Sequence, residues 1–290
     1  MIDRLRRYKR CVSPVVTMLF LFVVLLVGIS ISLTIIYPQT QELNDQMELS
    51  TAGTSLLNLD NAIKEMIING VDSQTIKGIY TGSFGTFALD QTSQMQFVMY
   101  NGIIPINLTQ YNPTYHNRLQ IFQTINQEVV APNSHSYLVG GSNQDYLFLN
   151  SSTRSLAPWT ILNQTRPTNS LDVITSLSYR ILIDSQSYIS DSNLNVTVSL
   201  QLVNFIPVNG KTAANSADPD IIIDYKGIVT NSSNWFSFTD DFTLQSALTL
   251  SDPSSTPSIE LPISQDIPPG LFTYYVKFIF NFHVFEIQIL

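Results

Sequence analysis

The segment from Val15 to Ile36 constrains this chain more than any other feature, because it is almost wholly apolar and carries no charge. As an α-helix its 22 residues span about 33 Å, enough to cross a hydrocarbon core of roughly 30 Å. A helix is required in lipid, since each unpaired backbone group costs several kcal/mol there. The alternative is a buried helix of a soluble protein. So long an uncharged run behind a basic cluster instead predicts one membrane-spanning helix.

Five basic residues before this segment predict its orientation. Only Asp3 opposes them, and such clusters stay in the cytoplasm. We therefore expect residues 1–11 inside and the chain after Tyr37 outside the cell, at the cell surface. The alternative is a secretory signal that is removed after the helix. The segment is longer than a usual signal core, and no small-x-small site follows Ile36. The basic residues are Arg4, Arg6, Arg7, Lys9 and Arg10.

The part of the chain beyond residue 37 is acidic, with nine Lys and Arg against 21 Asp and Glu. Binding of nucleic acid needs clustered positive charge, so we expect no nucleic-acid partner. The single cysteine, Cys11, precedes the membrane helix and leaves no intrachain disulfide. Stability outside the cell must therefore come from core packing or from assembly. The outer part is long enough for one large core or two small ones.

A short signature stands at the inner edge of the helix. Its residues are Arg10, Cys11, Val12, Ser13 and Pro14. This order of a basic residue, a small residue, Val-Ser-Pro and an apolar helix resembles the N-terminus of archaeal type IV pilin-like proteins. The resemblance implies that a prepilin peptidase-like enzyme cuts between Cys11 and Val12, so that the helix is retained for anchoring or self-assembly. Ser13 can cap the helix start, and Pro14 suits the first turn.

The signature departs from that family in two ways. Cys11 stands where such proteins more often have Gly or Ala, and no Glu lies near the mature start. The resemblance covers about 35 residues, and an unprocessed signal anchor is the alternative. Acylation of Cys11 is a further alternative to an unmodified thiol.

The helical pattern continues beyond the membrane. We expect a transmembrane helix over 12–37, which Pro38 ends or kinks, and an amphipathic stalk helix within 38–70 that Asn69-Gly70 closes. Its apolar stripe follows i, i+3, i+4 spacing. The stripe consists of Leu56, Leu59, Ile63 and Ile67.

Short alternating runs after Gly70 predict a β-rich domain over 71–290. Alternation is clearest from Leu177 to Ile183 and from Leu194 to Leu202, which is typical of antiparallel sheets with one buried face. The predicted fold is a β-sandwich-like, mainly antiparallel head, with a break near 163–170 if it forms two units. Further strands are expected at 76–80, 84–89, 95–100, 221–225, 236–239, 242–250 and 259–262.

Two regions of the sequence are compatible with more than one structure. The stretch 105–169 looks irregular, apart from a hairpin in which strands at 137–139 and 146–149 flank Gly140-Gly141. The apolar C-terminus from Leu271 to Leu290 could pass for a second membrane segment. Four polar or charged residues there would be costly in lipid, so we predict core strands instead. They are Lys277, Asn281, His283 and Glu286.

No catalytic or cofactor motif stands out, and we expect no enzyme activity, cofactor or metal. The three histidines are far apart in the sequence: His116 and His135 are expected on loops and His283 on a strand face. Two carboxylate clusters could hold Ca²⁺ or serve a glycosidase, but solvated loop acids are the simpler interpretation. The clusters are Asp218, Asp220 and Asp224, and Asp240 with Asp241.

Five Asn-x-Ser/Thr sequons lie beyond the membrane helix, where glycosylation enzymes act. Chance also produces sequons in a chain this rich in Asn, Ser and Thr. Asn195 falls on the polar face of its predicted strand. The candidate acceptors are Asn107, Asn150, Asn163, Asn195 and Asn231.

Together these features predict a non-enzymatic, pilin-like surface protein. It would be anchored or assembled through its N-terminal helix and display a β-sandwich head for adhesion or surface structure. The first alternative is a monomeric, single-pass anchored binding module, and an anchored hydrolase is a second.

Overall fold

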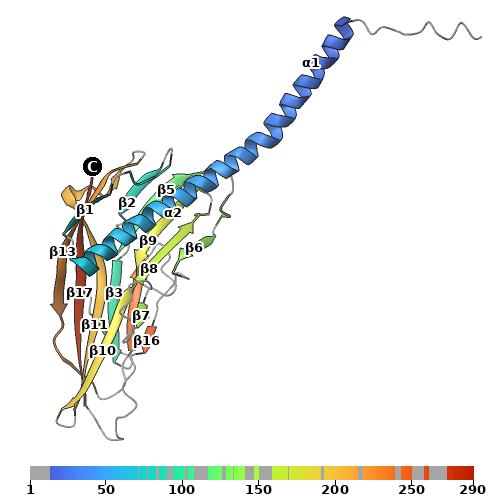
Figure 1. Cartoon of the computed structure of the whole chain (residues 1–290). Helices are drawn as coiled ribbons and strands as arrows, with labels where there is room; N and C mark the ends of the chain where they lie inside the picture. Colours follow the sequence, from blue (N-terminus) through green and yellow to red (C-terminus); the bar gives the residue numbers. More distant parts are fainter. Residues whose placement is uncertain are drawn as a thin grey trace, which may run out of the picture.

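The computed structural model shows one long helix that leads into an elongated β-rich head (Figure 1). This confirms the predicted fold class. The structure describes residues 14–70, 72–76, 78–82, 85–89, 94–101, 104–107, 117–125, 129–132, 134–140, 147–149, 159–168, 170–190, 193–214, 218–238, 243–249, 258–260 and 273–290.

The helix runs without a break through both predicted helical segments. It consists of α1 (Pro14–Ile31), a π-helical turn η1 (Ser32–Ile36) and α2 (Tyr37–Asn69). Pro38 lies in the first turn of α2 and does not end the helix, so that alternative of the prediction is wrong. Gly70 ends it as predicted, with φ at 67° and its N–H donated to the Met66 carbonyl.

Strands in the described residues form three sheets. The large sheet contains, from edge to edge, β1 (Ser73–Ile76), β13 (Ile221–Ser232), β17 (Thr273–Ile289), β11 (Asn193–Pro207), β10 (Ile181–Ser190) and β7 (Leu147–Leu149), with β14 (Phe236–Phe238) also paired to β17. The second sheet contains β12 (Ala213–Ala214), β2 (Thr86–Leu89), β5 (Arg118–Thr124), β9 (Asp172–Tyr179), β8 (Thr160–Thr165) and β6 (His135–Val139). The third contains β16 (Ser258–Glu260), β15 (Thr243–Thr249), β3 (Gln94–Asn101) and β4 (Ile104–Asn107).

Most strand pairs are antiparallel, but two pairs in the large sheet are parallel. These are β11 with β17, in continuous register from Asn193 to Pro207, and β10 with β7. The predicted C-terminal core strand is confirmed as β17. Because β11 and β17 are parallel, they are joined through a long connection that includes β12 to β16.

Two expectations for the middle of the chain are wrong. The strands on either side of Gly140-Gly141 do not form a hairpin, since β6 pairs with β8 in the second sheet and β7 pairs with β10 in the large one. The supposedly irregular stretch 105–169 contains β5 and β8, which both pair with β9. The proposed break near 163–170 falls at the connection between β8 and β9, which pair with each other.

The chain crosses from the second sheet to the large one at Arg180, between β9 and β10. The Arg180 N–H donates to the Trp159 carbonyl at 2.8 Å, and its guanidinium donates to the Gly140 carbonyl. The alternating run from Leu177 to Ile183 is therefore two strands in two sheets. Such crossings form the corners of β-sandwiches.

The main core lies where α2 meets the large and second sheets. Leu56, Leu59, Ile63 and Met66 on α2 are fully buried there, and Figure 1 shows α2 lying across the strands. The same hydrophobic cluster also contains Phe87, Leu177, Phe205, Ile223 and Phe285 from the two sheets.

In each of the two long central strands, β11 and β17, the buried face changes partway along the strand. In β17 the even-numbered residues from Val276 to Phe282 are buried, whereas from His283 to Ile289 the odd-numbered residues are buried. The same change occurs in β11, where burial follows Leu194 to Leu202 and then includes Val203 and Phe205. Only the half of this sheet that contains residues 203–207 and 283–289 therefore faces α2. The other half, called the lower half here, contains residues 193–202 of β11 and 273–282 of β17. In the lower half, the face with the odd-numbered residues of these two strands is partly open to solvent.

Candidate functional site

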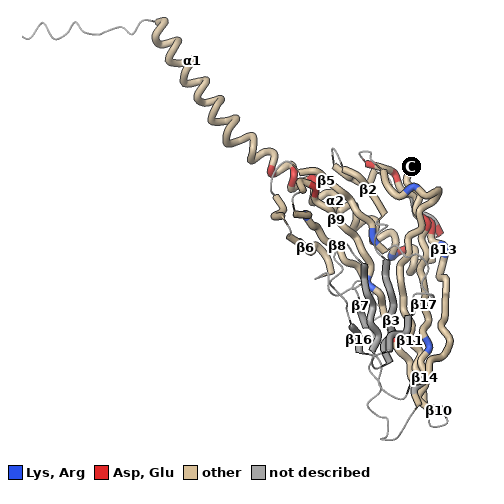
Figure 2. Tube along the Cα trace, turned by 180° about the vertical axis from the view of Figure 1, so that it is seen from behind, with Lys and Arg blue, Asp and Glu red and all other residues tan. Residues whose placement is uncertain are grey.

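The apolar surface of α1 is the most prominent candidate for function. None of its residues is buried, and side chains such as Phe20 and Leu25 are more than half exposed. Figure 2 shows no charged residue on α1, while acidic residues begin near the start of α2. The helix over Pro14–Asn69 is long and apolar enough to cross a membrane. Lipid or other apolar helices must cover such a surface in water, and its length and composition suit a membrane anchor.

The junction between the membrane segment and the head is built to accommodate Pro38. A proline inside a helix has no N–H to donate and its ring clashes with the carbonyl of the preceding turn. The wider π-helical turn Ser32–Ile36 ends two residues before Pro38 and contains Thr34, whose carbonyl is the one that the ring would crowd. Threonine hydroxyls supply extra donors to backbone carbonyls on both sides. Thr34 donates to Ser30 at 2.7 Å, and Thr40 donates to Ile36 at 2.9 Å.

A buried polar centre ties α2 to the second sheet. Asp60 on α2 is 2% exposed, and its Oδ1 accepts hydrogen bonds from Thr160 and Tyr179, each at 2.9 Å. Its Oδ2 pairs with the Lys64 ammonium at 2.7 Å. Burial, together with the nearby Asp60 carboxylate, raises the pKa of Tyr179 well above its usual range. This centre fixes the angle and register of the helix on the head.

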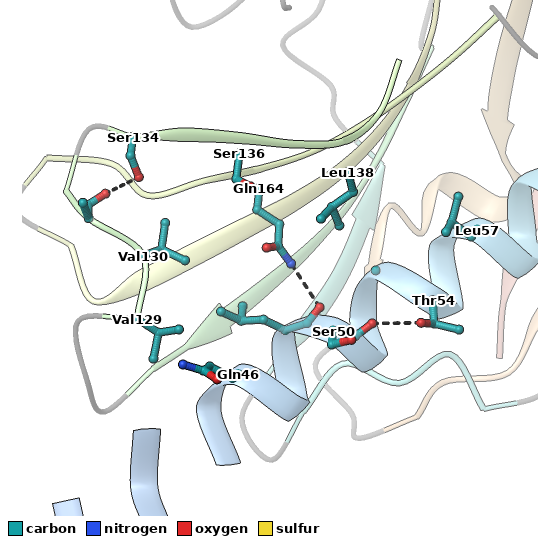
Figure 3. Close-up of a pocket in the computed structure, with 13 residues that line it drawn as sticks. Gln46, Ser50, Thr54, Leu57, Val129, Val130, Ser134, Ser136, Leu138 and Gln164 are labelled. Carbon is teal, nitrogen blue, oxygen red and sulfur yellow. Dashed lines mark hydrogen bonds between the residues drawn. The ribbon is translucent and has the colours of Figure 1, made fainter. Parts of the chain in front are cut away.

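A groove of about 570 Å³ lies beside α2, between the helix and the segment from Val129 to Leu138 (Figure 3). Gln164 lies at its base and donates to the Leu49 carbonyl at 3.0 Å. Gly53 forms part of the wall, where a Cβ would lie 3.0 Å from Leu138 Cδ1. The described lining residues carry no carboxylate, imidazole, thiol or amine, so they offer contact surface and neutral hydrogen bonds.

His283 occupies a second polar centre, in the large sheet, on the strand that the sequence predicted. Its Nδ1 lies 2.9 Å from the Tyr225 hydroxyl, and its Nε2 lies 3.2 Å from Gln201 Oε1. The Trp159 ring packs edge-on against the imidazole, with ring centroids 5.3 Å apart. Burial lowers the pKa of His283 to about 4. The imidazole is therefore neutral near pH 7 and serves as a structural link.

The other histidines and the acidic clusters give no centre of this kind. His135 lies on strand β6 and not on a loop, so that prediction is wrong, whereas His116 lies outside the described residues. Asp220 accepts the Gly78 N–H, and Asp224 pairs with Lys226. Within the described part of the chain, no group of three His, Cys, Asp or Glu could hold a metal ion. Asp240 and Asp241 lie outside it.

The structure covers only one residue of the proposed processing signal. Pro14 begins α1, whereas Arg10, Cys11, Val12 and Ser13 lie outside the described residues. The processing site therefore stays a prediction.

The sequon asparagines lie in different environments. Asn163 on β8 is 5% exposed, whereas Asn195 on β11 and Asn231 on β13 are partly exposed. Asn107 lies on β4, and Asn150 lies outside the described residues. Sequence reasoning placed Asn195 correctly on the more open face of its strand. It had no signal for the burial of Asn163, because this depends on pairing with β6 and β9.

Fold and site define a class: a β-rich head on a long helix whose apolar first part suits a membrane anchor. No known protein family, curated protein or solved structure matches the chain.

Proposed function

We propose that the chain is a non-enzymatic, pilin-like cell-surface protein that is anchored, and assembles, through its N-terminal helix. One observation carries the proposal: a single helix joins an uncovered apolar segment to the core of the head. Along α1 no residue is buried, whereas Leu56, Leu59 and Ile63 of α2 are completely buried. Packing of α1 against another copy would therefore position the whole head.

The polar centres support a structural role for the head. Asp60 and His283 both have hydrogen-bonding partners that tie neighbouring elements together. The described lining of the groove beside α2 carries no group for acid–base or nucleophilic chemistry of the usual kinds. We propose that the head serves adhesion or surface structure.

Orientation and processing are part of the same proposal. The basic residues before α1 favour a cytoplasmic N-terminus and an extracellular head. A prepilin peptidase-like enzyme would remove residues 1–11 and leave Val12 as the first residue. The membrane, further copies of the chain and this peptidase are the proposed partners.

Cysteine cross-linking in native membranes tests the proposal. In a Cys11→Ala background, which removes the native thiol, single cysteine substitutions at Val23, Val24, Leu25 and Leu26 cover every face of one turn of α1. The matched control is Thr168→Cys, at an exposed turn of the head. We expect oxidation to give disulfide-linked dimers for at least one α1 variant and none for the control. Monomers for all variants would contradict assembly through the helix.

That negative result would favour the alternative, a monomeric anchored binding module. The groove beside α2 is the observation that supports this alternative, since it could receive a partner without self-assembly. Electron microscopy of the cells separates the two hypotheses independently, because only the first predicts filaments.

A further inference from the structure

Three side chains form a row across the partly open lower face of the large sheet. Tyr188 on β10 is paired with Asn195 on β11, and Asn195 is paired with Tyr275 on β17. Paired residues point to the same face of a sheet, and neighbouring strands lie about 4.8 Å apart. The two tyrosines therefore stand roughly 10 Å apart, with Asn195 between them. The row lies close to the adjoining ends of β10 and β11 at Ser190 and Asn193, and these strands extend to the end of the head farthest from α1 (Figure 1).

Solvent reaches this row. Tyr188 is 55% exposed, and both Asn195 and Tyr275 are partly exposed. The adjacent residues on the opposite face, Leu194 and Val196, are 1% and 4% exposed. No hydrogen bond joins the Asn195 side chain to another of the described residues. Its amide is therefore available to react.

Asn195 also begins a sequon, Asn195-Val196-Thr197, whose two polar members lie on the same partly open face. Two of the other sequons are less suitable. Asn163 is buried between β6 and β9 in the second sheet, and Asn231 already interacts with other groups. The structure thus separates Asn195 from Asn163 and Asn231 by side-chain exposure and interactions, which the sequence alone does not show.

We propose that Asn195 carries an N-linked saccharide and that Tyr188 and Tyr275 hold its first ring between them. In the attachment step, Asn195 Nδ2 forms a bond to the anomeric carbon of a phosphate-activated saccharide. The bond from that carbon to the phosphate oxygen breaks, the phosphate leaves with the electron pair, and one Nδ2 proton passes to a base of the transferase. The apolar ring faces of a sugar pack on tyrosine rings, while Gln186 and Lys277, one row along the sheet, can bond its hydroxyls.

This inference rests on the proposed function in one respect, because glycosylation requires the head to be outside the cell. Peptide mass spectrometry of the full chain, purified from native membranes, tests both. Cleavage after Lys and Arg, but not before Pro, puts each of the five sequons on a separate peptide, and Asn195 lies on the peptide from Ile181 to Lys211. We expect that peptide to carry a glycan and the peptide with Asn163 to be unmodified.

The outcomes separate the two claims. If the Asn195 peptide is bare while another sequon is modified, the inference fails but the external head stands. If all five peptides are bare, protease treatment of intact cells decides. Digestion of the head shows that only the inference fails, whereas protection shows that the proposed orientation fails with it.

Thermal unfolding tests the role of the tyrosines. In the glycosylated protein, Tyr188→Ser and Tyr275→Ser should each lower Tm by roughly 2–4 °C more than they do in an Asn195→Gln background. The control, Tyr137→Ser on β6, should have the same effect in both backgrounds. Equal shifts in both backgrounds for Tyr188 and Tyr275 would overturn the proposed packing of the sugar.

Discussion

Replacing Asp60 by alanine would remove the acceptor for two donors that join α2 to the head and for a third donor, Lys64, on α2 itself. The Thr160 and Tyr179 hydroxyls would lose their bonds to Oδ1, and the Lys64 ammonium would lose its bond to Oδ2. The Thr160 and Tyr179 residues are fully buried, so water cannot replace the lost acceptor without a structural change. The Lys64 side chain is 19% exposed and has partial access to solvent.

The expected loss of unfolding free energy follows from the burial of these groups. A buried donor left without a partner costs about 1–3 kcal/mol, and breaking a buried ion pair from one side costs about 3–5 kcal/mol. These contributions share one carboxylate and do not add, so we expect Asp60→Ala to lose about 3–5 kcal/mol of unfolding free energy. The variant Asp60→Asn keeps an acceptor for both hydroxyls and should lose less.

Urea unfolding of the detergent-solubilised chain measures the effect. Trp159 is 1% exposed and lies 6.3 Å from the Tyr179 ring, so its fluorescence reports on this region. The matched control is Glu65→Ala, an exposed acid on the same helix, which should change stability by about 0.5 kcal/mol or less. Equal, small losses for Asp60→Ala and the control would refute the argument that this centre holds the helix on the head.

Three further predictions concern other parts of the fold. His283 has a pKa of about 4 in the folded protein against about 6.5 unfolded, so the unfolded state binds the proton first and stability falls as pH drops from 6.5 to 4. The loss should reach up to about 3 kcal/mol, and urea midpoints at both pH values should show it for the wild type but much less for His283→Gln. Gly70→Ala should lower the free energy of unfolding by about 1–2 kcal/mol, because φ at this position is 67°. The control, Gly28→Ala within α1, should leave thermal unfolding unchanged, because no atom lies within 4 Å of the new Cβ. Phe205→Ala should cost about 3–5 kcal/mol in the same assay, since the side chain is completely buried in the core.

Local patterns in the sequence predicted those features that depend on neighbouring residues. The charge-free run from Val15 to Ile36 predicts a helix by length and composition, and Gly70 predicts its end. The alternation from Leu194 to Leu202 predicts a strand with one buried face, which β11 confirms. The C-terminal polar residues correctly favoured a strand over a second membrane helix.

Features that depend on distant partners could not be predicted in this way. The turn signal Gly140-Gly141 does not encode which sheet each neighbouring strand joins, so the expected hairpin was wrong. Register between β11 and β17 depends on side chains about 80 residues apart. No local pattern marks Asp60, because its partners Thr160 and Tyr179 lie 100 and 119 residues away. By contrast, Leu119 and Ile121 of β5 alternate with polar residues, so this strand could have been predicted from the sequence.

The central claim is that the apolar helix is retained as an anchoring and assembly element after a leader is removed in front of it. The most direct test is the N-terminal sequence of the mature protein purified from native membranes, by Edman degradation or by terminal-peptide mass spectrometry. We predict a first residue of Val12, followed by Ser13 and Pro14. A protein that starts at Met1 would contradict the processing claim, and one that starts after Ile36 would contradict the membrane anchor as well.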